Sequence, residues 1–208
     1  QRWLYGIPPA GNANFAWLQH MIYHLSARGK MGVVLSNGSL SSQTAGEGEI
    51  RRRIVEADLV DCIVAMPPQL FYSTQIPVSL WFINKRKKQP GKTLFIDARK
   101  MGKMVTRSLR ELTDDEIRKL ADTHKAFEAE TLEEVKGFCA IATIEEIAEH
   151  DYILTPGRYV GIEESEDDAE PFEEKMERLT SELSELFKQS SELEQEVRNR
   201  LGAIGFEF

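Results

Sequence analysis

The chain has 208 residues, of which 41% are hydrophobic, enough for one full domain and an appendage. No apolar run approaches the roughly 18 to 20 residues that cross a bilayer, so we expect no membrane partner. Two cysteines, Cys62 and Cys139, lie outside any C-x-x-C or Cys/His cluster. This argues against a disulfide framework and a structural zinc site, and it favours a reducing compartment, the cytoplasm.

Charge is unevenly distributed along the chain, whose net charge is −8. Residues 163–196 hold fourteen acidic and three basic residues, a local net charge of −11, which leaves the remainder at +3. The acidity therefore belongs to the C-terminal arm. The mildly basic globular part is compatible with DNA contact without requiring it.

The apolar pattern predicts alternating helices and strands over the first part of the chain. A helix is expected at residues 14–27, with Asn12 or Asn14 as its N-cap and Gly29 as its stop. The further elements are a buried strand at 31–35, a helix at 47–58, a buried strand at 59–67, and strands at 78–85 and 93–97.

This order of elements predicts an α/β fold, the second half of a doubly wound, Rossmann-like sheet. The sequence contains no G-x-G-x-x-G and no G-x-x-x-x-G-K loop. Residues 45–50, AGEGEI, hold two glycines, but no strand ends directly before them. A nucleotide-binding loop is therefore the weaker alternative at this position.

Two more helices are predicted further along, at residues 113–127 and 143–154. Each begins with a threonine that is followed three residues later by a glutamate, the spacing of a capping box. The two pairs are Thr113 with Glu116 and Thr143 with Glu146.

The last segment predicts a long amphipathic helix of coiled-coil type, because apolar residues alternate at spacings of four and three over about four heptads. This apolar seam, with Ser190 filling one position, consists of Phe172, Met176, Leu179, Leu183, Leu186, Leu193 and Val197. Such a helix needs a partner helix. The predicted parts of the chain are a sheet half at 1–90, a mixed α/β extension at 91–161, an acidic linker at 162–171 and the long helix at 172–204.

Several blocks together resemble one family, and they occur in its order over nearly the whole chain. They read YGIPPAGNANFAWLQH, VLSNGSLSS, GEGEIRRRIVEADLVDCIVAMPPQLFYSTQIPVSLWFINK, LFIDARK, ELTDDEI and DYILTPGRYVG. They are similar to the C-terminal half of the modification subunit of type I restriction-modification systems, an N6-adenine DNA methyltransferase. The terminal heptad helix is the least specific part of this resemblance.

The resemblance implies a cofactor, S-adenosylmethionine, bound through a glycine-rich loop, and an (Asn/Asp)-Pro-Pro-(Phe/Tyr) tetrapeptide that binds the adenine amino group. Neither element is found in this sequence. The Pro-Pro pairs in residues 7–10 and 66–69 are preceded by Ile7 and Met66, whose side chains cannot accept from an amino group. We therefore expect the chain to start just after the tetrapeptide, with no catalytic residue of its own and no tightly bound cofactor.

The resemblance also assigns a role to Phe71, which matches an aromatic position that stacks on the extruded base in amino-methyltransferases. A target base must leave the duplex stack, and an aromatic face replaces part of the lost stacking. The alternative is a hydrophobic plug at the edge of the sheet, with Tyr72 as a loop ring.

Other polar residues are weaker candidates. Asn37 and Ser39 follow a strand at the ligand-facing edge and are predicted to line the substrate pocket, or else to form a polar turn. Residues 51–53, three arginines, predict a solvated helix face that pairs with nearby acidic residues, with phosphate contact as the alternative. The four histidines show no metal-ligand grouping, so no metal site is predicted.

Two functions remain open for the chain. In the first, it is part of a subunit that transfers a methyl group from S-adenosylmethionine to adenine N6 in DNA. In the second, it is an assembly module whose seam helix docks on a partner; the alternatives for this helix are self-association into a dimer and packing against its own domain. The resemblance implies that this partner is the DNA-specificity subunit, within a complex that also holds a restriction subunit.

Overall fold

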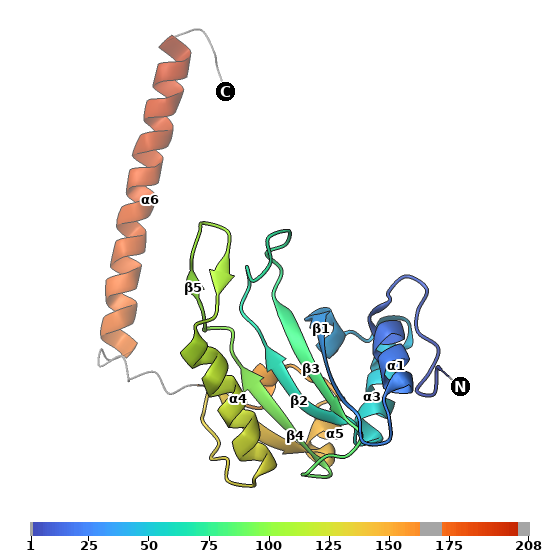
Figure 1. The fold of residues 1–208 in the computed structure, drawn as a ribbon. Helices are drawn as coiled ribbons and strands as arrows, with labels where there is room; N and C mark the ends of the chain where they lie inside the picture. Colours follow the sequence, from blue (N-terminus) through green and yellow to red (C-terminus); the bar gives the residue numbers. More distant parts are fainter. Residues whose placement is uncertain (1, 163–171, 204–208) are drawn as a thin grey trace. The chain divides into compact units, whose positions relative to one another are not determined.

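The computed structural model describes residues 2–162 and 172–203, in two compact units that lie within residues 1–163 and 164–208 (Figure 1). The first unit begins with α1 (Asn14–His24), β1 (Lys30–Ser36), α2 (Gly38–Ser41), the 3₁₀ turn η1 (Thr44–Gly46), α3 (Glu47–Glu56), β2 (Val60–Ala65) and β3 (Val78–Asn84). It continues with β4 (Lys92–Asp97), β5 (Lys103–Met104), β6 (Arg110–Glu111), α4 (Asp114–Glu128), β7 (Cys139–Thr143), α5 (Ile144–Glu149) and η2 (Pro156–Arg158). The second unit is α6 (Phe172–Ala203).

A five-stranded mixed sheet organises the first unit, in the order β1-β3-β2-β4-β7. β3 is antiparallel to both of its neighbours, β2 and β4 are parallel, and β7 is antiparallel to β4. β5 and β6 form a separate two-stranded hairpin. The predicted α/β fold with a long C-terminal helix is confirmed.

Helices cover both faces of the central part of the sheet, so the strand side chains there are buried on one side or the other. Ile63 and Trp81 pack with α1, α3 and α5 in one apolar core. Cys62 and Val64 belong to a second core, which includes Phe127 of α4. Because successive residues of a strand face opposite sides, β2 is buried along its whole length.

The ends of the predicted elements needed correction in several places. α1 ends at His24, and its N-cap position is Ala13, because the Asn12 side chain instead accepts from the N–H of Asn14 (3.0 Å). Gly29 is therefore not the helix stop. Both predicted capping boxes are confirmed, but α5 is shorter than expected, ending at Glu149.

The strand prediction was also incomplete. β1 is an outer strand in which only Leu35 is buried, so the expectation of a buried strand is wrong there. β7, the β5–β6 hairpin and the short α2 were not predicted. β4 and β7 lie in the same sheet as β1 to β3, and the four-part division of the chain stays a prediction. Most of the acidic linker, residues 163–171, lies outside the described residues.

α6 confirms the predicted long helix, whose last predicted residue, 204, lies outside the described residues. The described members of its apolar seam are all substantially exposed, from 43% for Met176 to 62% for Leu193. The side chain of Phe172 is not among the described ones. None of the described helices combines the length and the apolar character needed to cross a bilayer.

Candidate functional site

One edge of the sheet gathers the loops that follow its parallel strands. β1 and β2 run in the same direction because both are antiparallel to β3, and β4 is parallel to β2. The segments after these strands, at residues 37–46, 66–77 and 98–113, therefore leave from the same edge (Figure 1). In open α/β sheets, ligands bind beyond the carboxyl ends of the strands. We call this the carboxyl edge and take it as the candidate site.

The loop between β2 and β3 carries Phe71 at the carboxyl edge. Its base is closed by two backbone bonds, from Met66 N–H to Val78 O (2.9 Å) and from Gln69 N–H to Gln75 O (3.4 Å). Phe71 is 39% exposed, so part of its ring is accessible and it is not a buried plug. Tyr72 is 93% exposed. The stacking role of Phe71 stays a prediction.

The segment after β1 places Asn37 and Ser39 differently. The Ser39 hydroxyl is buried, donates to Ser36 O (2.8 Å) and accepts from the indole N–H of Trp81 (3.1 Å). Asn37 is half-buried, and its Oδ1 is buried without a hydrogen-bond partner in the described part of the chain. Ser39 thus supports α2, whereas Asn37 keeps an unused acceptor. Their pocket roles stay predictions.

A buried arginine holds two segments of this unit together, and the predicted solvated face is wrong for it. Arg51 is 0% exposed; its Nε donates to Tyr152 O (2.6 Å) and its NH1 to Ser42 O (2.7 Å). Burial lowers the pKa of its guanidinium, and the charge of Glu47 opposes that effect. Arg51 therefore connects the chain after β1 to the turn after α5.

The next two arginines confirm the prediction of a solvated face with acidic partners. Arg52 and Arg53 both pair with Glu49, each at 2.7 Å. The hydrogen bond from Arg52, together with that from Arg53, lowers the pKa of Glu49 to about 2. Their charges are thus matched within α3, which weakens the alternative of phosphate contact.

The two glycines at the start of α3 do not fit a cofactor loop. Gly46 has a φ of 86°, and it turns the chain into α3 rather than out of a strand. A Cβ on Gly48 would lie 1.6 Å from Oε1 of Gln43, so this glycine makes room for a side chain of the same protein. The carboxylate of Glu47 lies at the helix N-terminus and accepts from Ser42 Oγ (2.5 Å).

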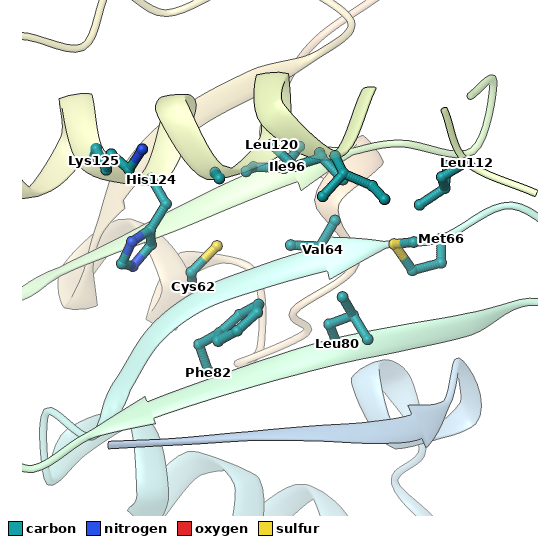
Figure 2. Close-up of a pocket in the computed structure, with 12 residues that line it drawn as sticks. Cys62, Val64, Met66, Leu80, Phe82, Ile96, Leu112, Leu120, His124 and Lys125 are labelled. Atoms are coloured by element: carbon teal, nitrogen blue, oxygen red, sulfur yellow. The ribbon is translucent and has the colours of Figure 1, made fainter. Parts of the chain in front are cut away.

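An apolar cavity of about 460 Å³ lies between α4 and the sheet (Figure 2). Its wall includes Cys62, Leu80, Phe82 and Leu120, and its polar lining residues are His124 and Lys125. S-adenosylmethionine is a sulfonium cation whose ribose diol needs polar partners such as a carboxylate. A cavity with an ammonium and no carboxylate does not fit it, so this cavity is not a candidate site for the implied cofactor.

The structure brings together one group of metal-ligating residue types that the sequence did not reveal. Ligand atoms of Asp61, His124 and Glu128 lie within 4.8 Å of one another. His124 Nε2 is 3.1 Å from Asp61 Oδ2, and Glu128 pairs with Lys30 (2.5 Å) and Lys88 (3.0 Å). Both lysines pair with Glu128, and Asp61 pairs with His124, so the carboxylates of this group already have partners within the protein. Asp61 and Lys30 lie near the amino ends of β2 and β1, away from the carboxyl edge.

Comparisons with known proteins agree with this geometry. The family model described as N-6 DNA Methylase matches residues 1–168. The type I restriction enzyme HindI methylase subunit of Haemophilus influenzae is 56% identical over 99% of this chain and 47% of its own length. The MjaIX methylase subunit of Methanocaldococcus jannaschii is 47% identical over 96% of this chain and 36% of its own length.

A solved structure shows the same fold. The methyltransferase subunit of a type I restriction-modification system from Streptococcus thermophilus superposes with a TM-score of 0.69 at 32% identity, over 76% of this chain and 32% of that one. The chain thus spans less than half the length of these relatives. The resemblance to type I modification subunits is confirmed, and the chain belongs to the N-6 DNA methylase family.

Proposed function

We propose that this chain is part of a type I methylase subunit that transfers a methyl group from S-adenosylmethionine to adenine N6 in DNA. The match of the family model to residues 1–168 carries this proposal. In it, the chain contributes the second half of the methyltransferase sheet and the base-facing loops of its carboxyl edge. S-adenosylmethionine supplies the methyl group, held by residues outside the described ones.

The chain's own contribution to the reaction is to hold the target base. Adenine must leave the duplex before its amino group is reached. Phe71 is partly exposed at the carboxyl edge, where a ring replaces stacking worth about 1 to 3 kcal/mol per base. Proximity and alignment then supply much of the rate.

The test uses the intact subunit in its complex, with labelled S-adenosylmethionine and DNA that carries a fluorescent adenine analogue at the target. We expect methyl transfer to adenine N6. Phe71→Ala should reduce the fluorescence change that reports the extruded base, whereas Tyr72→Ala, which removes a more exposed neighbouring ring, should change it little. Unchanged base extrusion in the Phe71 variant would exclude the stacking role, and absence of methyl transfer by the intact wild-type subunit would exclude the activity.

A titration with S-adenosylmethionine tests whether the 208-residue chain binds the cofactor without the rest of the subunit. The two glycines at the start of α3 do not follow a strand, and the apolar cavity beside α4 does not fit the cofactor. We therefore expect the 208-residue chain to bind S-adenosylmethionine poorly in a calorimetric titration. Tight binding would show that the cofactor site lies within the chain.

A second function is supported by α6. Its seam residues Leu183 and Leu186 are 50% and 53% exposed, and apolar seams of this spacing pack against partner helices. We propose that the seam docks on the DNA-specificity subunit, in a complex that also contains a restriction subunit. The acidic outer face of the helix disfavours misplacement onto DNA.

Assembly can be tested by truncation and by a matched pair of substitutions. Removing the residues after Gly161 should abolish association with the specificity subunit in size-exclusion chromatography. Leu183→Glu places a charge in the seam and should do the same, whereas Ser181→Glu, two positions away and outside the seam, should not. Retained association of the truncated protein would reject the docking role.

A further inference from the structure

The β5–β6 hairpin carries a strong positive charge at the carboxyl edge. We define the basic hairpin as residues 99–111, which contain five basic residues and one acidic residue. Neither the family match nor the predicted site residues assign it a role. Because it follows β4 at the edge where the Phe71 loop follows β2, the hairpin and this loop stand at the same edge of the unit (Figure 1).

Internal hydrogen bonds hold the basic hairpin in place. The N–H of Gly102 donates to Glu116 Oε1 (2.7 Å), which ties the hairpin to the first turn of α4. The guanidinium of Arg110 donates to the carbonyls of Met101 and Gly102, both at 3.0 Å. This arginine therefore closes the hairpin from within. These hydrogen bonds hold the hairpin in one conformation before a ligand binds, so less conformational entropy is lost on binding.

Other cations of the hairpin differ in their availability. Arg99 forms an ion pair with Asp97 (2.5 Å). Lys103 is exposed and near Glu116, whose pKa is lowered chiefly by the backbone hydrogen bond from Gly102, with a smaller effect from the charge of Lys103. Arg107 is exposed in the turn between β5 and β6, and it forms no ion pair with the described residues. Of the basic residues near the tip, Arg107 is thus the one whose charge is least balanced by acidic groups of the protein, and Lys103 is the next.

The hairpin is also hydrogen-bonded to the loop that carries Phe71, near the base of that loop. The N–H of Arg110 donates to Gln69 O (2.7 Å), two residues before Phe71. Met104 and Val105 of the hairpin are 44% and 51% exposed. Cations beside exposed apolar and aromatic side chains form a surface suited to a nucleic-acid strand, whose phosphates are anionic and whose extruded bases stack on rings.

We propose that the tip of the basic hairpin binds the DNA backbone beside the nucleotide presented to Phe71, with Arg107 holding one phosphate and Lys103 assisting. This rests on the proposed function, since it takes DNA as the substrate. The hairpin positions the strand and reads no sequence, because phosphates carry no sequence information. The backbone hydrogen bond from Arg110 to Gln69 links the hairpin to the Phe71 loop.

The experiment measures DNA affinity of the intact subunit in its complex, without cofactor, at several salt concentrations. Losing one phosphate contact reduces the slope of log affinity against log salt by about 1 and weakens all sequences alike. We expect this for Arg107→Ala and a smaller change for Lys103→Ala. The matched control is Arg118→Ala, which removes the same charge from an exposed position of α4 paired with Asp115 and should leave the slope unchanged.

Each other outcome decides against the proposal. An unchanged slope and affinity in Arg107→Ala would overturn it, and so would an equal loss in the Arg118→Ala control. Loss of subunit association with no change in salt slope would show that the tip is a protein contact. Methyl transfer is measured separately, so an inactive wild-type complex would reject the proposed function while the salt slope still decides the role of the hairpin.

Discussion

The sheet unit and α6 use the same apolar residue types in opposite settings. Ile63 and Trp81 are each 0% exposed, because helices of the same unit cover both faces of the sheet. Leu183 and Leu186 of α6 are half exposed. The apolar side chains of the sheet are therefore satisfied by their own chain. The described seam side chains have no such cover within α6, so mutations in the two regions should have different readouts.

The largest expected effect is in the sheet unit. Trp81 packs edge-to-face with Phe15, with ring centroids 6.2 Å apart, and donates to Ser39. Trp81→Ala should lower the free energy of unfolding by about 3 to 5 kcal/mol. Leu186→Ala should change it by less than about 0.5 kcal/mol, because that side chain is half exposed. Urea unfolding of the 208-residue chain measures both, and equal losses would remove the contrast between the regions.

A smaller effect separates buried from exposed arginines on one helix. Arg51→Ala removes the donors to Tyr152 O and Ser42 O. Leaving such buried groups unpaired costs about 1 to 3 kcal/mol. Arg52→Ala is the matched control, since its ion pairs with Glu49 and Glu56 lie at the surface and should contribute little. Urea unfolding that ranks Arg52 above Arg51 would contradict the buried role.

The smallest expected effect is a pH dependence on the surface of α3. Hydrogen bonds from Arg52 and Arg53 lower the pKa of Glu49 from 4.5 to about 2. A carboxyl whose folded pKa is lowered stabilises the fold above its unfolded pKa. This stabilisation is lost as the pH falls from about 4.5 through 2. The difference in urea midpoint between wild type and Glu49→Gln should therefore be constant above pH 4.5 and shrink below it. A difference that grows on acidification would contradict this sign.

The apolar runs in the sequence were sufficient to predict the central strands, because β2 and β3 are buried by elements on both faces. The same logic missed β7, a five-residue strand directly before a capping box, and the hairpin, whose strands have two residues each. β1 was predicted as buried because its residues are apolar, yet it is an outer strand. Exposure of that kind depends on neighbours, which a local pattern does not specify.

The candidate site was partly predictable. The resemblance singled out Phe71, and the structure places it in the loop between β2 and β3 with part of its ring exposed. The burial of Arg51 had a usable signal, because Glu47, Ile50, Arg51 and Ile54 share one face at helical spacing. The proximity of Asp61 to His124 had none, since 63 residues separate them.

The position of β3 between β1 and β2 has a consequence for how the chain acquires its structure. β1 makes its ladder with β3, pairing Lys30 with Asn84 and Ser36 with Val78. β1 therefore emerges from the ribosome well before the strand that will pair with it. Closing that long loop delays β1, while β2 and β3 form a hairpin from neighbouring sequence. Incorporation of β1 is thus expected to be the late event in forming the sheet.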